Sequence, residues 1–213
     1  MPLVYQQNIN LNTKLGVWHI AEDEGFFIEK VPLQREITHP HKRLQHLAGR
    51  YLLTELFPDF PYHLIRIADT RKPFIENESY HFSISHCGDY AAVMVSTASR
   101  VGVDVERFTV KVEKVKHKFL SDTELEILQK IANSNTSVSL LQLLTAAWSI
   151  KESLYKWYGS GEIDFKEHLV INGFHTDANE GVASCTVDKN ESVPLHVHFL
   201  FFNSNCISWV VSN

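Results

Sequence analysis

The order of elements along the sequence predicts an α+β fold. Segments with the composition of strands cluster in the middle and at the end of the chain, and the long helical segments stand apart from them. Segregation of this kind is typical of antiparallel sheets with packed helices rather than of a doubly wound parallel sheet. The composition agrees, because 44% of the 213 residues are hydrophobic, which is enough to build a buried core.

Two long segments have the apolar spacing of helices. The first, at residues 39–57, has Pro40 in its first turn and Pro58 after its end. The second, at residues 139–158, is followed by glycines at 159 and 161. Between them, Ser121 and Glu124 have the spacing of a capping box and predict a shorter helix to about residue 131, with a polar loop at residues 133–137.

Short runs rich in β-branched and aromatic residues predict the strands. They lie at residues 80–85, 90–96, 101–107, 167–172, 182–187, 194–202 and 206–211. The first two are separated by residues 86–89, which predict a hairpin turn. We place the domain boundary after this hairpin, which gives an N-terminal half at residues 1–99 and a C-terminal half at residues 100–213.

Charge and cysteine content exclude several functional classes. The chain has 20 Lys and Arg against 25 Asp and Glu, a net charge of -5, so it lacks the overall basic charge of nucleic-acid-binding proteins and we expect no nucleic-acid partner. We expect no membrane span, because no apolar run is long enough, and no secretory signal begins the chain. The three cysteines are sparse and odd in number, which favours a reduced, cytoplasmic protein.

Two carboxylates share one face of the strand predicted at residues 101–107. Because strand side chains alternate, Asp104 and Glu106 lie on the same face as Gly102. They would be about 7 Å apart along the strand, close enough to converge on one Mg²⁺ ion. Gly102 would let a ligand or backbone approach beside them. The same pattern alone also fits the solvated face of an edge strand.

The helix at residues 139–158 carries a third carboxylate. Trp148, Glu152 and Lys156 recur every four residues and therefore form one stripe. Their neighbours are largely apolar, and a partly buried carboxylate and ammonium need partners or a ligand. A surface Glu–Lys pair is the ordinary alternative.

Taken together, these residues fit phosphoryl-type transfer, which depends on positioning and charge neutralisation. Three carboxylates can hold one magnesium ion, and nearby lysines can neutralise phosphate. The carboxylates are Asp104, Glu106 and Glu152, and the lysines are Lys72, Lys151 and Lys156.

Three groups of side chains in the N-terminal half can bind an anion. One lies on a single face of the first helix, one surrounds a proline that holds the preceding residue extended, and one lies at the predicted hairpin turn. In that order they are Arg43, His46 and Arg50; Arg71, Lys72 and Pro73; and Ser85 and His86. Each group also fits an ordinary polar surface.

Four short segments, in this order, make the sequence resemble the 4′-phosphopantetheinyl transferases, in particular their larger monomeric (surfactin-synthetase-activating) type. The segments are R-K-P at residues 71–73, F-S-I-S-H at 82–86, G-V-D-V-E at 102–106 and W-S-I-K-E-S-L-Y-K at 148–156. The sequence departs from the family at Arg71, where the family has glycine, and at Ser83, where it has asparagine.

The resemblance implies two similar α+β halves related by pseudo-twofold symmetry, each with a small, mostly antiparallel sheet and packed helices. The N-terminal half would bind coenzyme A, and the C-terminal half would bind metal and catalyse. The implied activity is that of a holo-[acyl-carrier-protein] synthase type enzyme. It moves the 4′-phosphopantetheine arm of coenzyme A onto a serine of an apo acyl or peptidyl carrier protein, with Mg²⁺, and releases adenosine 3′,5′-bisphosphate. The enzyme would be a monomer.

The resemblance also implies residue roles. Asp104, Glu106 and Glu152 would hold Mg²⁺; Asp104, Glu152 and Lys156 would be catalytic, with Glu152 taking the serine proton. Contacts to coenzyme A would come from Arg43, His46, Arg71, Lys72, Pro73, Ser85, His86, Asp104, Lys151 and Lys156. Two other interpretations stay open: a magnesium-dependent phosphohydrolase or nuclease, and a non-catalytic protein that binds coenzyme A or a carrier protein.

Overall fold

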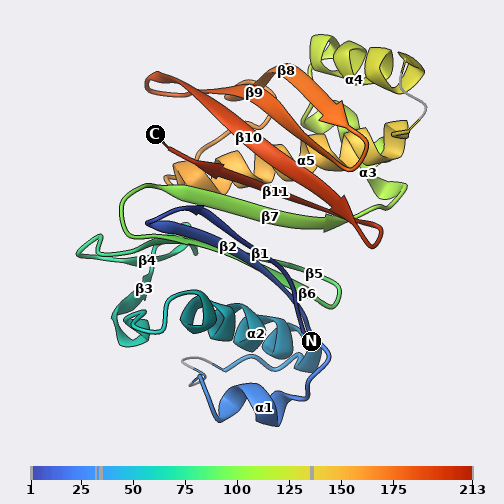
Figure 1. The fold of residues 1–213 in the computed structure, drawn as a ribbon. Helices are drawn as coiled ribbons and strands as arrows, with labels where there is room; N and C mark the ends of the chain where they lie inside the picture. Colours follow the sequence, from blue (N-terminus) through green and yellow to red (C-terminus); the bar gives the residue numbers. More distant parts are fainter. Residues whose placement is uncertain (1, 32, 34–35, 135–136, 213) are drawn as a thin grey trace. The chain divides into compact units, whose positions relative to one another are not determined.

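The structure is a computed structural model that describes residues 2–31, 33, 36–134 and 137–212. The chain divides into two compact units, Met1–Val101 and Gly102–Asn213, two residues beyond the boundary expected from the sequence. Each unit combines a small, mostly antiparallel sheet with packed helices (Figure 1). The predicted α+β class is therefore confirmed.

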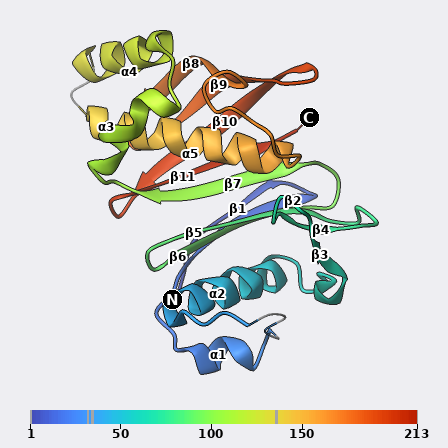
Figure 2. The same ribbon diagram turned by 180° about the vertical axis from the view of Figure 1, so that it is seen from behind.

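The N-terminal unit is a four-stranded antiparallel sheet with helix α2 along one face (Figures 1 and 2). The strand order is β1-β2-β6-β5, and a separate two-stranded ribbon pairs β3 with β4. The elements are β1 (Leu3–Asn10), β2 (Thr13–His19), α1 (Glu24–Ile28), α2 (Pro40–Leu56), η1 (Tyr62–Leu64), β3 (Ile65–Ile67), β4 (Pro73–Ile75), β5 (His81–Cys87) and β6 (Tyr90–Ser96).

Helix α2 is confirmed within one residue at each end. His39 is its N-cap, since the imidazole accepts a hydrogen bond from the backbone N–H of Lys42, and Pro40 stands in the first turn. Its apolar side, including Leu47, Leu52 and Leu56, is fully or almost fully buried in the core of this unit.

The hairpin of β1 and β2 does not follow from the sequence analysis. β1 is an edge strand with the exposed polar run Gln6, Gln7 and Asn8, so it lacks the alternation by which strands are recognised. The predicted turn at residues 86–89 is also corrected. β5 extends to Cys87, so that the turn consists of Gly88 and Asp89 and His86 belongs to the strand.

The C-terminal unit packs helix α5 against a five-stranded sheet of order β7-β11-β10-β9-β8 (Figure 2). Its predicted strands and helices are present, and most are longer than expected. The elements are β7 (Val101–Arg107), α3 (Lys111–Val115), η2 (Lys116–Lys118), α4 (Asp122–Ser134), α5 (Leu140–Tyr158), β8 (Leu169–Asp177), β9 (Glu180–Asp188), β10 (Ser192–Phe202) and β11 (Asn205–Val211).

The helix boundaries of this unit follow their capping residues. The backbone N–H of Ser121 donates to Glu124 Oε2 at 2.7 Å, and that of Glu124 donates to Ser121 Oγ at 3.2 Å, which confirms the predicted capping box. Ser139 caps α5, and Gly159, at φ 75°, ends it. The loop was predicted at residues 133–137, but α4 continues to Ser134, so residues 133 and 134 are helical instead. Residues 135 and 136 lie outside the described residues.

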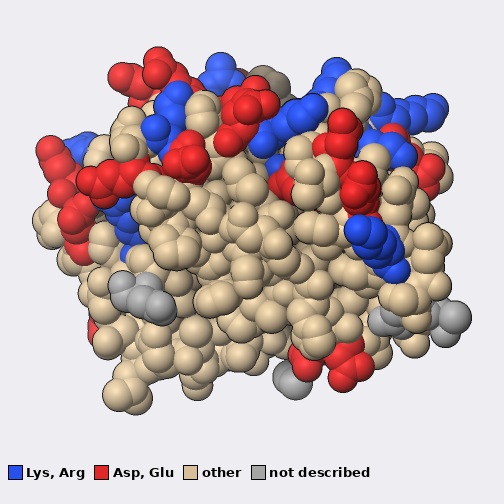
Figure 3. Space-filling view, turned by 90° about the horizontal axis from the view of Figure 1, so that it is seen from above, with Lys and Arg blue, Asp and Glu red and all other residues tan. Residues whose placement is uncertain are grey.

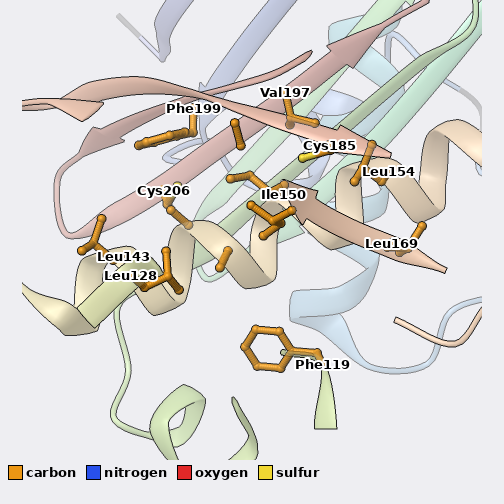
Figure 4. Close-up of a cluster of buried hydrophobic side chains, with 14 of the residues drawn as sticks. Phe119, Leu128, Leu143, Ile150, Leu154, Leu169, Cys185, Val197, Phe199 and Cys206 are labelled. Carbon is orange, nitrogen blue, oxygen red and sulfur yellow. The ribbon is translucent and has the colours of Figure 1, made fainter. Parts of the chain in front are cut away.

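The core of the C-terminal unit lies between α5 and the sheet. Ile150 and Leu154 of α5 are fully buried among strand residues that include Val197, Phe199 and Cys206 (Figure 4). This packing fixes α5 against the sheet and therefore fixes the side chains on the rest of the helix.

The surface carries charges of both signs. Lys and Arg side chains alternate with Asp and Glu side chains around an uncharged area on the face in Figure 3. Such mixing agrees with the modest net charge of -5. In the described part of the chain, no helix is both long and apolar enough to cross a membrane.

Gly102 on β7 allows α5 to approach this strand very closely. A Cβ at this position would overlap the carbonyl oxygen of Ser153 and lie 2.9 Å from the backbone nitrogen of Trp157. Both contacts are with helix backbone, which cannot turn aside as a flexible side chain can. The sequence analysis proposed that this glycine admits a ligand or backbone, and the structure shows helix backbone.

We therefore expect Gly102→Ala to lower the free energy of unfolding by about 2 kcal/mol, through overpacking. Urea denaturation measures this loss. Gly173→Ala on β8 is the matched control, because its added methyl would lie 3.8 Å from Ser184 Cβ, an ordinary contact. Equal stability of Gly102→Ala and the control would contradict the close packing of α5 on β7.

Candidate functional site

Strand β7 and helix α5 bring together the acidic residues and the lysine expected from the sequence. Lys156 Nζ donates to Asp104 Oδ1 at 2.6 Å. Trp148 Nε1 donates to Glu106 Oε1 at 3.2 Å. The two ends of the predicted helical stripe thus contact the two carboxylates of the strand, and Glu152 lies between them in sequence, on the same stripe. We call Asp104, Glu106, Glu152 and Lys156 the acidic cluster.

Burial is the main reason why the pKa of Glu152 is raised, and the negative charge of its neighbours adds to the effect. Burial and the neighbouring carboxylate of Asp104 raise it to about 7, with a further contribution from Glu106, and Lys156 opposes the rise. A carboxylate with this pKa exchanges a proton near neutral pH. It is therefore suited to general acid–base work.

Aromatic side chains hold Trp148 in place. Its ring stacks on Phe165, with centroids 5.5 Å apart, and meets Phe119 edge-on at 5.0 Å. Because the indole is fixed on both sides, its N–H is aimed steadily at Glu106. Three buried serines also hold helix α5 on the sheet. The hydroxyls of Ser149 and Ser153 of α5 hydrogen-bond the hydroxyl of Ser208 of β11 at 2.8 and 2.6 Å. The sequence analysis missed these serines, which have no distinguishing pattern.

The acidic cluster fits a magnesium ion in its chemistry. Mg²⁺ prefers hard oxygen ligands, and three carboxylates here interact closely enough to shift the pKa of Glu152. Within the described ranges, no three His, Cys, Asp or Glu side chains already surround one point as metal ligands would. The types of donor therefore suit the ion.

Lys151 contacts residues outside the acidic cluster, and these contacts stabilise the fold. Its side chain is fully buried, and Nζ contacts Glu124 Oε1 and the carbonyl oxygen of Phe165 at 2.8 and 2.9 Å. Burial lowers the pKa of Lys151, and Glu124 partly counteracts this. Glu124 also accepts from the backbone N–H of Ile171 at 2.8 Å, so this network joins α4, α5 and β8. The structure does not bring Lys151 to the acidic cluster.

The N-terminal unit contains a cavity of about 590 Å³ with a basic lining. Its lining residues are His46, Arg50, His63, Ile65, Arg66, Ile67, Arg71, Pro73, Ile84 and His86. Three arginines and three histidines in this set, with no acidic residue, suit an anion with several negative charges. Four of the predicted site residues are here: His46, Arg71, Pro73 and His86.

Three basic residues of this cavity were not among the residues expected to contact coenzyme A. Arg50 was expected only as part of a basic helix face, and it is 4% exposed, with its guanidinium carbon 5.9 Å from the centre of the Tyr62 ring. His63 and Arg66 come from η1 and β3, which are too short to be recognised from periodicity. Pairing of Ile67 with Pro73 brings β3 beside the predicted R-K-P segment.

Arg71 occupies a backbone conformation that favours glycine. Its φ is 65°, in the left-handed region, which explains why a glycine at this position suits the loop. Lys72 is partly buried, and burial together with the charge of Arg100 lowers its pKa to about 8. Ser85 is 7% exposed. Lys72 and Ser85 are not among the described residues that line the cavity.

Arg43 has a different partner from the one expected. Its Nε and Nη2 each lie 2.8 Å from an oxygen of Glu24, a bidentate pair, and Nη1 donates to the carbonyl oxygen of Ile37 at 2.8 Å. The pair joins α1 to α2. It is not among the described residues that line the basic cavity.

Comparison with known proteins gives consistent matches. Residues 100–200 match the family model described as the 4′-phosphopantetheinyl transferase superfamily. The chain is 30% identical to the 4′-phosphopantetheinyl transferase gsp of Aneurinibacillus migulanus over 67% of this chain and 56% of that protein. It is 32% identical to enterobactin synthase component D of Escherichia coli over 54% of each, and 28% identical to the L-aminoadipate-semialdehyde dehydrogenase-phosphopantetheinyl transferase of Xenopus laevis over 54% and 43%. The chain spans about half the length of the curated relatives it matches.

The environment of Glu152 predicts a pH-dependent cost to stability. Because its pKa is raised from 4.5 to about 7, the folded chain binds its proton more tightly than the unfolded chain, and stability falls as pH rises between these values. We expect Glu152→Gln to remove this fall and to exceed the parent in stability at pH 8 by about 3 kcal/mol.

Urea denaturation at pH 5 and pH 8 measures the effect. Glu126→Gln on α4, at an exposed position, is the matched control and should leave the pH profile unchanged. A parallel pH profile of Glu152→Gln and the parent would show that Glu152 is not crowded by its neighbours.

Proposed function

We propose that the chain transfers the 4′-phosphopantetheine arm of coenzyme A to a serine of an apo carrier protein, releasing adenosine 3′,5′-bisphosphate. Residues 100–200 match the 4′-phosphopantetheinyl transferase superfamily, which supports this proposal. The observation that supports this most is the acidic cluster, in which Lys156 contacts Asp104 beside a carboxylate whose pKa is about 7. These residues come from the G-V-D-V-E and W-S-I-K-E-S-L-Y-K segments.

Phosphate binding is the part of the proposal that concerns the N-terminal unit. Coenzyme A carries a pyrophosphate and a phosphate monoester, and the basic cavity offers arginine and histidine donors without a competing acid. His46, Arg71 and His86 are the predicted residues that would donate to these phosphates. Arg50, His63 and Arg66 add to the positive charge.

In the proposed reaction, each member of the acidic cluster has one task. Asp104, Glu106 and Glu152 would hold Mg²⁺, which would neutralise pyrophosphate charge when bound. Glu152 would accept the proton from the carrier serine as the serine oxygen bonds to the phosphorus of the phosphopantetheine phosphate. The pyrophosphate bond from that phosphorus to the bisphosphate oxygen would break at the same step. Lys156 would place positive charge beside the departing phosphate of the bisphosphate.

We also propose a cytoplasmic monomer of the larger type within the family. All three cysteines are free, as is usual in a reducing compartment. Both the basic cavity and the acidic cluster are formed by one chain, so that neither needs a second copy.

A transfer assay tests the proposal. The purified protein is mixed with coenzyme A, Mg²⁺ and an apo carrier protein, and the carrier is weighed by mass spectrometry. We expect a mass gain of one phosphopantetheine arm, and Asp104→Ala should slow its appearance by about 100-fold or more, because the Lys156 contact and a metal ligand are lost. Glu126→Gln serves as the control with full activity.

The outcomes separate the other interpretations. Hydrolysis of coenzyme A without labelling of the carrier would indicate a phosphohydrolase. Binding of coenzyme A without any reaction would indicate a non-catalytic protein. Either outcome would contradict the proposed transfer.

A further inference from the structure

Lys156 is bound to a residue that the proposed function assigns to the metal. The hydrogen bond from Nζ to Asp104 Oδ1 is short, at 2.6 Å, and joins two opposite charges. The Asp104 side chain is 4% exposed and that of Lys156 24% exposed, so little water compensates the carboxylate charge. In the structure, the ammonium of Lys156 therefore neutralises the charge of Asp104, as a bound metal ion would also do.

The charge balance of the acidic cluster indicates that the ammonium of Lys156 and a divalent metal ion would compete for the same carboxylate. Three ionised carboxylates and one ammonium leave a net charge of -2, which a divalent cation would cancel. An ion bound at Asp104 would also stand close to Lys156, and the two positive charges would repel each other.

We infer that a divalent cation and the ammonium of Lys156 compete for Asp104, and that binding of the cation releases Lys156 toward an anionic ligand. This inference rests on the proposed function, because that function makes Asp104 a metal ligand. Lys156 stands near the C-terminal end of α5, a long helix that is fixed by its buried face, so the release needs only side-chain rotation. The same lysine would then pass from a carboxylate to a phosphate when the metal arrives.

Selective acylation of lysine in the unmodified protein tests the release. A small amine-reactive ester is applied with and without Mg²⁺, and the modified lysines are quantified by peptide mass spectrometry. Release predicts that Mg²⁺ raises the labelling rate of Lys156 severalfold, because its amine loses the Asp104 contact. The exposed Lys130 of α4 is the internal control and should not change. A rate at Lys156 that is unchanged or lowered by Mg²⁺ overturns the inference.

Binding of Mn²⁺, followed by electron paramagnetic resonance, tests the competition. Lys156→Met should bind Mn²⁺ about fivefold more tightly than the parent, the effect of removing a partly buried ion pair that opposes the metal. Lys156→Arg, which keeps the charge, and Lys130→Met, which removes a charge elsewhere, should bind as the parent does. If Lys156→Met fails to fold, Lys156→Gln replaces it, since its amide still donates to Asp104 without charge. Affinity of the neutral variants equal to or weaker than that of the parent overturns the inference.

Comparing the transfer assay with the acylation and Mn²⁺-binding experiments distinguishes a failure of this inference from a failure of the proposed function. Labelled carrier protein together with unchanged Lys156 acylation would leave the function standing and overturn the exchange. Tighter Mn²⁺ binding and raised acylation without carrier labelling would support the exchange and contradict the function.

Discussion

The close approach of helix α5 to strand β7 is the constraint on which the candidate site depends. It is possible only because Gly102 has no side chain where the backbone of Ser153 and Trp157 passes. The same face of β7 then presents Asp104 and Glu106, and the adjacent stripe of α5 meets them. A site made of acids and a lysine is thus positioned by a contact that contains no charge.

Two neighbouring charged residues of helix α5 have different roles: Lys151 stabilises the fold, and Glu152 belongs to the acidic cluster. Lys151 turns into the unit and is fully satisfied by Glu124 and a backbone carbonyl, where it ties the helix to α4 and β8. Glu152, one residue later, faces the acidic cluster, where its pKa is raised to about 7. About 100° of helical rotation separates the two side chains, so one helix provides both the anchor and the chemistry.

Features that depend on residues close to one another in the chain could be predicted from the sequence. The start of α2 at Pro40 and the capping box at Ser121 depend on neighbours in the chain, and both are present. Alternation along β7 likewise placed Asp104 and Glu106 on one face. The edge strand β1 was missed because its polar exposed residues hide the alternation, although its partner β2 is buried on both faces.

Long-range partners could not be predicted from the sequence. Nothing near Arg43 in the chain indicates that Glu24 would bind it, and nothing near Lys151 indicates Glu124. A basic residue on a helix looks the same whether it awaits a ligand or has a partner across the fold. Arg50, which lines the cavity, became distinguishable only once the short ribbon of β3 and β4 was in place.

Diffraction from crystals grown with Mn²⁺ and adenosine 3′,5′-bisphosphate tests the central claim most directly, because the anomalous signal locates the metal without assumption. We predict one strong peak within ligand distance of Asp104, Glu106 and Glu152, with Lys156 directed at a phosphate. A peak bound elsewhere on the protein, with Lys156 still on Asp104 and the three carboxylates apart, would contradict the account.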